Sequence, residues 1–510
     1  MKNIDITKTP LDDKPTWDLI CEGHTKGVFQ LETHLGKHWC KEAQPRDLEE
    51  LADVISIIRP GTLKAIEEGK SATQRYVDRK NGSEETRSLY GPIDKVVATT
   101  YNIIIYQEQA MQIAQVMAGF TESQADTLRK AIGKKKADLM KKVKGEFIEG
   151  CLKEGHDQDD ADKIFDIIEK SSRYSFNKSH AISYALMAYW SAYLKANKPI
   201  DFYLNWLVGA KEKIDPDKEI YELAESAKLD NIKINTPSHN HLESNFSIQG
   251  ESIYFGITNV KNVGLNEYVK IKTLTEQHNP STWVEFLVRV LPNVNKRAVN
   301  NLISVGYFSK LGKTRAEMLH EFSCIKDLTK KELEIVDERL DSKKDIRYNL
   351  ENLNRTKKEG GAVSTTKRLE AFGDIISRLS NPGRNLSDNP MSIAISEENM
   401  LGVAISCSKV DACADASYAN TTCKELSDGK KGKSIVAAEI TRIKEFVTKN
   451  KDTMAFVSAR DDSLEIENIV VFPEPYEKFG DIIYEGATVL LFGEKAKDRN
   501  SFIVNEVHQI

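Results

Sequence analysis

The segment from Arg173 to Lys195, RYSFNKSHAISYALMAYWSAYLK, constrains the fold of this chain more than any other. It opens with a turn-like run of serine and asparagine and then takes on the spacing of an amphipathic helix. The apolar residues at helical spacing are Ile182, Ala185, Leu186, Tyr189 and Tyr193. The pattern therefore predicts a long helix that starts within a polar turn.

Basic side chains and a tyrosine gather where this helix is expected to begin: Arg173, Lys178, His180 and Tyr184. A helix N-terminus exposes unpaired N–H groups and carries a partial positive charge, so cations there suit a polyanion such as a triphosphate or a phosphodiester backbone. The alternative interpretation is an ordinary N-terminal cap on a core helix. The segment alone does not separate the two.

Five segments, taken together, carry a resemblance to a known family. They are GVFQLET (27–33), IIRPGTL (57–63), YNIIIYQEQAMQIAQ (101–115), LRKAIGKKK (128–136) and FNKSHAISYAL (176–186), in that order. The series resembles the fingers region of the bacterial C-family replicative polymerases, the alpha subunits of DNA polymerase III. The resemblance is close from residue 1 to about residue 320 and continues as family-like patches to the end of the chain.

Composition excludes several other classes of protein. A chain of 510 residues has room for about three or four domains. It has no apolar run long enough to span a bilayer and no apolar signal core in MKNIDITKTPLDD, so we expect no membrane association and a cytoplasmic location in a bacterium or a phage-infected bacterial cell. The net charge of −5 requires any surface that binds nucleic acid to be local.

The seven cysteines are scattered and form no C-x-x-C pair. Cys21 with His24 and His38 with Cys40 are the only close cysteine and histidine neighbours, and the GVFQLET segment between them already has a family explanation. We therefore expect reduced thiols and no metal site in this chain.

The region before residue 120 is predicted to be mainly helical. Arg59-Pro60-Gly61 ends a helix, because proline cannot continue it, and the resemblance implies that Arg59 contacts a phosphate. Residues 101–106 are expected to form a short strand, and Gln107 to begin a helix that ends at Gly119. Thr121 and Gln124 fit a capping box that opens the next helix.

A strongly basic segment follows. Residues 129–144 contain eight Lys or Arg and one acid, Asp138. A solvated helix face is one interpretation of this asymmetry. The resemblance implies another, in which Arg129 and Lys130 face the incoming triphosphate or the template backbone. Lys130 stands where the family has the second arginine of a pair, and lysine keeps the charge but loses the bidentate fork. Behind the two residues lies the cluster Lys134, Lys135 and Lys136.

Polymerase fingers supply cations for the β and γ phosphates and a surface for the new base pair, but not the metal site. The resemblance assigns the first task to Arg129, Lys130, Lys178 and His180, and the second to Tyr184. Nucleotidyl transfer also requires aspartates that hold two Mg²⁺ ions. Two candidate D-x-D pairs are Asp157 with Asp159 and Asp215 with Asp217. They fall at a helix start and in a turn, not in an apolar strand.

We therefore expect no catalytic or metal-binding residue in this chain and no activity by the chain alone. Mg²⁺ would be bound by a palm on a separate chain or in a missing N-terminal part. A split gene and a fragment of a longer protein both fit this expectation, and the split gene is the interpretation we prefer.

The segment FGITNVKNVG (255–264) resembles the family's helix-hairpin-helix region, in which hairpin amides hold a duplex phosphate. It contains Lys261 and Gly264 but has Asn262 and Asn266 where the family has glycine, and asparagine is the next most permissive residue for φ > 0. A plain helical hairpin is the alternative. The resemblance implies further sequence-independent phosphate contacts at Lys296, Arg297, Lys313 and Arg315.

From Asp327 to Asn354, opposite charges at i, i+4 spacing predict one solvated helix or a short coiled coil. The family's peptide that binds the sliding clamp has no convincing copy nearby. A sliding clamp is therefore a possible partner for which the sequence shows no motif. Residues 434–510 alternate like five short strands, which predicts an OB barrel that binds single strands by base stacking. The candidate aromatics are Phe456, Phe472, Phe492 and Phe502, most of them expected in the core.

The expected fold is multidomain and mainly α, with a C-terminal five-stranded β-barrel of OB type. The expected domains are fingers (1–225), helix-hairpin-helix (226–322), charged helical linker (323–395) and OB domain with its lead-in segment (396–510). The expected function is that of a DNA polymerase component that binds dNTP, primer-template duplex and template single strand. The alternative is a non-catalytic accessory protein that binds DNA.

Overall fold

The computed structural model describes residues 5–134, 137–171, 174–496 and 501–510. The described chain forms two compact units. Unit 1 comprises the residues up to Trp206 together with Glu225–Asn231, and unit 2 comprises Leu207–Ala224 and Ile232–Ile510. Arg173, Lys135 and Lys136, which the sequence analysis singled out, lie outside the described residues.

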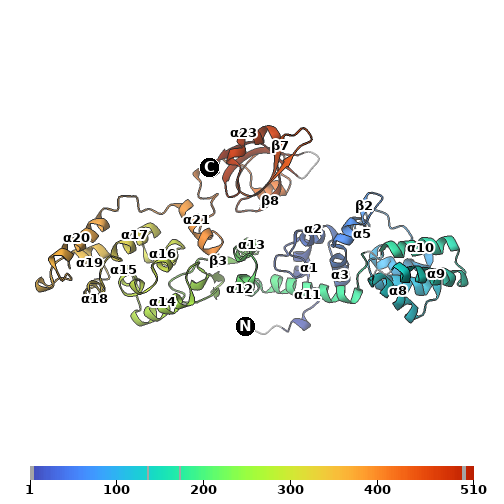
Figure 1. Cartoon of the computed structure of the whole chain (residues 1–510), viewed down its shortest axis with the longest axis horizontal. Helices are drawn as coiled ribbons and strands as arrows, with labels where there is room; N and C mark the ends of the chain where they lie inside the picture. The colour runs from blue at the N-terminus through green and yellow to red at the C-terminus, as the bar shows by residue number, and fades with distance from the viewer. Residues whose placement is uncertain (1–4, 135–136, 172–173, 497–500) are drawn as a thin grey trace. The chain divides into compact units, whose positions relative to one another are not determined.

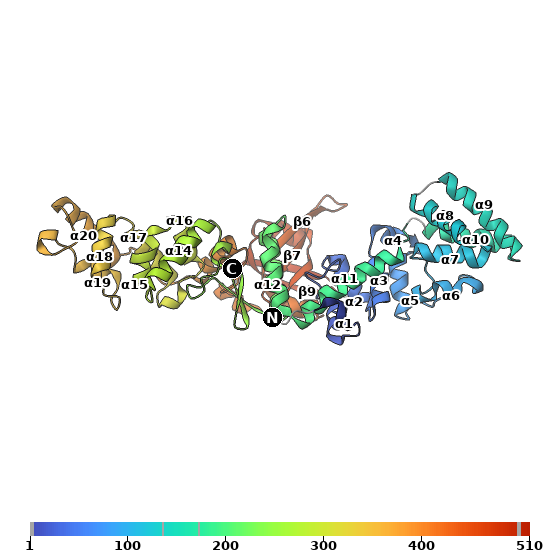
Figure 2. The same cartoon turned by 90° about the horizontal axis from the view of Figure 1, so that it is seen from below.

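Unit 1 is built from helices and one two-stranded hairpin, drawn in blue to green in Figures 1 and 2. Its elements are α1 (Lys14–Cys21), α2 (His34–Ala43), α3 (Leu48–Ile57), α4 (Pro60–Lys64), β1 (Ile66–Glu67), β2 (Lys70–Ser71), α5 (Ala72–Lys80), α6 (Asp94–Val97), α7 (Gln107–Ala118), α8 (Glu122–Lys134), α9 (Ala137–Lys153), α10 (Gln158–Ser171) and α11 (Lys178–Asn197). Helices α12 (Pro199–Gly209) and α13 (Pro216–Leu229) contain residues of both units.

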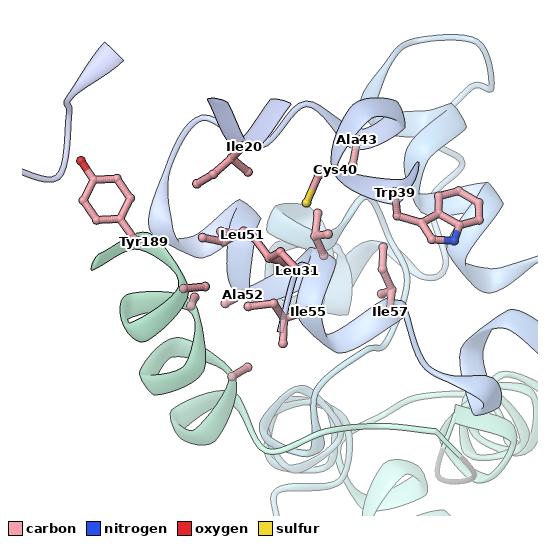
Figure 3. Close-up of a cluster of buried hydrophobic side chains, with 14 of the residues drawn as sticks. Ile20, Leu31, Trp39, Cys40, Ala43, Leu51, Ala52, Ile55, Ile57 and Tyr189 are labelled. Carbon is pink, nitrogen blue, oxygen red and sulfur yellow. The ribbon is translucent and has the colours of Figure 1, made fainter. Parts of the chain in front are cut away.

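The predicted long helix is confirmed as α11, which begins at Lys178 after the cap Asn177. Its buried stripe agrees with the expected one at Ala185 and Tyr189, but alanines otherwise form it: Ala181, Ala188 and Ala192 are fully buried, whereas Ile182 and Leu186 are only partly so. Alanines at this spacing let α11 pack closely on α3, and Figure 3 shows the apolar side chains of the first helices facing it. Tyr189 closes the cluster and donates its hydroxyl to the Pro10 carbonyl at 2.6 Å.

A buried lysine ties the far end of α11 to the loop after α1. Lys195 Nζ donates to the His24 carbonyl at 2.7 Å and to the Ser226 hydroxyl at 3.0 Å. Burial lowers the pKa of Lys195 to about 8. These bonds are one reason why residues 225–231 belong to unit 1.

Helices α7 to α10 pack around a second apolar cluster that includes Phe120, Phe147 and Phe165. Gly119 ends α7 with φ +60°, and Thr121 and Gln124 form the expected reciprocal hydrogen bonds at the start of α8. The prediction of a strand at residues 101–106 is wrong. Tyr101 and Asn102 are left-handed, and the segment makes a single bridge, between Tyr106 and Phe176.

Unit 2 opens with a three-stranded sheet and a run of helices. The sheet has the order β3-β5-β4. The elements up to the barrel are β3 (Lys233–Asn235), β4 (Ser247–Gln249), β5 (Ser252–Tyr254), α14 (Leu265–His278), α15 (Trp283–Glu285), α16 (Lys296–Ser304), α17 (Arg315–Ile325), α18 (Lys330–Glu338), α19 (Ile346–Glu351), α20 (Thr366–Ser380), α21 (Pro390–Leu401) and α22 (Cys423–Ser427).

The single charged helix expected from Asp327 to Asn354 is wrong. Two short helices, α18 and α19, stand there, and Val336, Ile346 and Leu350 are fully buried with Phe372 of α20. The buried Glu332 carboxylate accepts two hydrogen bonds, both at 2.8 Å, from the Arg368 guanidinium. Apolar residues interspersed among the charges therefore fold this region into packed helices instead of one solvated rod.

The five strands expected after residue 434 are confirmed as a closed barrel of order β10-β8-β7-β6-β9. They are β6 (Lys433–Val447), β7 (Thr453–Arg460), β8 (Glu465–Val471), β9 (Thr488–Lys495) and β10 (Phe502–Gln509), with α23 (Pro473–Phe479) between β8 and β9. β10 runs parallel to β8, and the other neighbouring strands are antiparallel. This is an OB-type arrangement, drawn in red in Figure 1. Across all described residues, no helix has the length and apolar character needed to cross a membrane.

Candidate nucleotide and nucleic-acid interface

The start of α11 is held by a carboxylate from another helix. Glu108, in the first turn of α7, accepts from the Asn177 side-chain amide at 2.6 Å and from the Lys178 backbone N–H at 2.9 Å. The Lys178 ammonium lies 5.7 Å from the centre of the Tyr106 ring. These hydrogen bonds fix the backbone at the start of α11. The Lys178 side chain there is half-buried.

Four aromatic rings follow one another beside this turn. His180 lies 4.0 Å from Tyr184 and 5.3 Å from Phe176, and Tyr184 lies 5.1 Å from Phe29, all between ring centres. His180 is exposed, and Tyr184 is half-buried. The spacing of His180 and Tyr184 on a helix predicts their contact. The contributions of Phe29 and Phe176 were missed, although both belong to the quoted segments.

Arg129 and Lys130 lie on α8 and share one partner. The Arg129 guanidinium and the Lys130 ammonium each approach the Asp126 carboxylate to 2.7 Å. Their hydrogen bonds hold the pKa of Asp126 below its usual value. Exposed pairs of this kind are weak, so both cations can turn to a phosphate at little cost. Lys134 ends the same helix.

Arg59 occupies a structural position. Its guanidinium donates to the Ser56 and Tyr174 carbonyls at 2.9 and 2.7 Å and covers the Phe176 ring at 4.1 Å. Burial lowers the pKa of Arg59. The side chain therefore fixes the segment that leads into α11, and a phosphate contact by Arg59 stays a prediction.

The hairpin before α14 keeps its turn through asparagine. Asn262 is left-handed with φ +65°, as its tolerance for that region allows. Gly264, in contrast, caps α14 with φ −83°, and Asn266 lies within that helix. The glycine is therefore not required for the turn geometry. Lys261 pairs with Asp217 at 2.6 Å, and both side chains are about half exposed.

The four other predicted DNA contacts divide into two classes. Lys296 and Arg297 are exposed at the start of α16. Lys313 pairs with Glu321, and Arg315 donates to Glu397 at 2.8 Å and to the Ser304 carbonyl at 2.7 Å. The Glu397 side chain is fully buried, so Arg315 is committed to the interior of unit 2. Of these four residues, Lys296 and Arg297 present their charge to solvent, whereas Lys313 and Arg315 would first have to break their ion pairs.

The barrel exposes two of the predicted aromatics and buries one. Phe456 and Phe472 are 41% and 45% exposed, whereas Phe502 is in the core. Phe492 packs against His508. Phe446, 53% exposed and 6.5 Å from Phe456, was missed, although an aromatic residue on the outward face of a long strand is a signal for it. The β6–β7 register pairs Lys444 with Phe456, which places a cation beside these rings.

The first acidic pair lies at a helix start, as predicted, with Asp159 in the first turn of α10. The turn expected for the second pair is wrong, because Asp217 lies in the first turn of α13 and Asp215, just before that helix, accepts from the Lys218 backbone N–H. Asp217 also pairs with Lys261. Among the described residues, no three His, Cys, Asp or Glu side chains come together as a metal site. The described part of the chain thus does not fit the two-Mg²⁺ centre of nucleotidyl transfer.

Comparison with known proteins is consistent with this arrangement. Residues 1–155 match the bacterial DNA polymerase III alpha subunit finger domain, and residues 231–318 match a helix-hairpin-helix motif. DNA polymerase III subunit alpha of Aquifex aeolicus is 31% identical over 99% of this chain and 40% of its own length. The same subunits of Saccharopolyspora erythraea and Staphylococcus epidermidis are 30% and 28% identical over 96% and 100% of the chain.

The chain spans 40% to 44% of the length of these curated relatives. It is matched almost from end to end by one kind of protein, with the finger and helix-hairpin-helix families in the same order as the two helical regions described above. The chain belongs to the bacterial DNA polymerase III alpha subunit family and corresponds to a C-terminal part of that subunit.

Proposed function

We propose that the chain works as part of a DNA-directed DNA polymerase, in which it binds the incoming dNTP and the DNA. The observation that carries the proposal is the cationic, ring-lined start of α11 within the finger unit. Lys178 and His180 would contact the triphosphate there, and Tyr184 would provide a face for the new base pair. Arg129 and Lys130 would add positive charge where pyrophosphate leaves.

The proposal assigns the Mg²⁺ ions and the reacting carboxylates to a palm outside this chain. It places the assembled enzyme in the cytoplasm, where bacterial replication takes place.

Primer extension tests the proposal. The chain would be assayed with Mg²⁺ and four dNTPs, alone and together with a polypeptide that carries a D-x-D palm. We expect synthesis only in the mixture. Arg129→Ala and Lys178→Ala should each reduce synthesis about 100-fold, because they remove charge that is needed most in the transition state, with little change in DNA affinity. Lys153→Ala, at an exposed ion pair on α9, is the control.

Unchanged synthesis by both variants would contradict the triphosphate assignment. Synthesis by the chain alone would contradict the palm assignment.

The barrel supports a second part of the proposal, that it binds the template single strand. Phe446 and Phe456 are exposed on neighbouring strands, and Lys444 pairs with Phe456 in the register. Each stacked base is worth about 1 to 3 kcal/mol. Phe446→Ala and Phe456→Ala should therefore weaken single-strand binding by that amount, measured by fluorescence anisotropy. Tyr418→Ala, at an exposed aromatic outside the strands, should not.

The same surface favours one alternative, a non-catalytic accessory protein that binds DNA through the barrel and the hairpin. In that case the barrel variants would lose DNA affinity, and the α8 and α11 variants would behave like the unaltered chain in every assay. The two functions are thus separated by Arg129 and Lys178.

A further inference from the structure

A cavity of about 620 Å³ lies within unit 1, apart from the start of α11 that the proposed function uses. Its walls come from the β1–β2 hairpin, α5, the segment 102–104, the end of α10 and Tyr174. Ligand pockets for small molecules range from about 300 to 1,000 Å³, so this cavity is large enough for a compact organic molecule.

Part of the lining is apolar. Ile103 and Ile104 are buried in the wall, and Leu89 and Ile167, both half-buried, also line it. Burial of the hydrocarbon or ring body of a ligand against these side chains stabilises the complex by roughly 25 cal/mol per Å² of apolar surface removed from water.

Five cations line the cavity, and three of them are used to build it. Arg75 donates to the Glu67 carbonyl at 2.7 Å, and Arg79 donates to the Tyr101 carbonyl at 2.9 Å. Lys70 pairs with Asp78 and Glu84 at 2.6 and 3.0 Å. These groups hold the hairpin, α5 and the 101–102 turn around the cavity.

The other two cations, Lys64 and Lys170, stand at the rim. Lys170 has one weak partner, Glu67, at 3.4 Å with both side chains about two-thirds exposed. Lys64 is exposed, and no acidic group lies within ion-pair distance of it among the described residues. Against these five cations stand four carboxylates among the lining residues and their partners. They are Glu67, Glu68, Asp78 and Glu84. The cavity therefore retains positive charge.

Tyr174 also lines the cavity. Burial and the nearby Glu67 carboxylate raise the pKa of Tyr174 to about 12. At neutral pH the phenol keeps its proton, so it can donate a hydrogen bond to an anion or to a ring nitrogen.

We propose that this cavity is a binding site for a small organic phosphate with an apolar ring body, of the size of a nucleoside monophosphate. The ring lies against the isoleucine side, and the phosphate meets Lys64 and Lys170 at the rim. The proposal concerns a site distinct from the triphosphate position at α8 and α11 and does not depend on polymerase activity.

The test uses the full chain with isoleucine methyl groups labelled for NMR, together with titration calorimetry. The probes are dAMP, deoxyadenosine and inorganic phosphate at millimolar concentration. We expect dAMP to shift the methyl signals of Ile103, Ile104 and Ile167. Both other probes should bind at least about tenfold more weakly, because deoxyadenosine lacks the phosphate and inorganic phosphate lacks the ring.

The variant Lys64→Glu/Lys170→Glu should weaken dAMP binding about tenfold, because two rim cations become anions. Lys153→Glu, at another exposed pair, is a control for charge reversal away from the cavity. Ala65→Leu should narrow the cavity and weaken binding without a change of charge. Thermal unfolding of each variant checks that it folds. Arg129→Ala should bind dAMP as the unaltered chain does, which separates this site from the proposed triphosphate contact.

Three results would overturn the proposal. They are the absence of a dAMP-dependent shift at the three isoleucines, equal affinity for inorganic phosphate, and equal affinity for deoxyadenosine. The second would leave a plain anion site, and the third would leave an apolar cavity whose cations take no part.

Discussion

At the scale of single residues, the buried Asp53 carboxyl links the stability of the chain to pH. It accepts from the Tyr76 and Tyr106 hydroxyls at 2.9 and 2.6 Å, and burial raises its pKa to about 7. The folded chain thus holds this proton at higher pH than the unfolded chain does. The stability linked to Asp53 is complete below about pH 4, the unfolded pKa, and is lost as the pH rises through about 7.

Asp53→Asn removes that titration. Relative to the unaltered chain, this variant should gain stability as the pH rises from about 5 to about 8, in urea unfolding followed at each pH. Asp138→Asn, at an exposed aspartate, is the control for the loss of one carboxylate at the surface. A pH-independent difference for Asp53→Asn would contradict the raised pKa.

The Arg315–Glu397 pair makes a second prediction at this scale. Arg315→Met leaves the fully buried Glu397 carboxylate without its cation, although Ser406 and the Ile405 N–H still donate to it. Loss of one partner of a buried pair costs about 3 to 5 kcal/mol. Urea unfolding should show that loss in the single variant and a smaller one in Arg315→Met/Glu397→Met. Equal stability of the single variant and the unaltered chain would place the pair at the surface.

At the scale of elements, the hairpin before α14 depends on one left-handed residue. Asn262→Ala should destabilise the chain by about 1 to 2 kcal/mol, because alanine disfavours φ +65°. Asn262→Gly should be tolerated. Gly264→Ala should also be tolerated, since φ is −83° and nothing lies within 4 Å of an added Cβ. Thermal unfolding distinguishes the three, and a large loss for Gly264→Ala would contradict the turn geometry.

At the scale of the whole molecule, the net charge of −5 requires DNA to bind through local basic surfaces, and such binding should depend strongly on salt. On duplex DNA, log affinity should fall with log salt by about 0.9 per neutralised phosphate. Lys296→Glu/Arg297→Glu should lower that slope by about 2, whereas Lys330→Glu/Lys331→Glu, a matched pair at the start of α18, should not. A flat salt response would argue against both proposed functions.

The sequence by itself determined the elements whose signals are local. The caps of α8 and α11 and the end of α7 at Gly119 follow from residue type and spacing, because the hydrogen bonds and φ angles involved lie within a few residues. The five barrel strands follow from the alternation of apolar and polar residues along each strand, whereas their pairing joins segments distant in sequence. The ordered series of motifs likewise identified the family, because five motifs in one order are specific even though each motif alone is weak.

Only the tertiary structure decided which cations are free to act and which are structural. Arg59 and Arg315 have the same chemistry as Arg129, but carbonyls and carboxylates distant in sequence bind the first two inside the fold. The same holds for residues 327–354, where scattered apolar side chains meet those of α20 and break the expected rod. Burial and long-range pairing depend on which segments pack together, and that information is not contained in the spacing of charges along the chain.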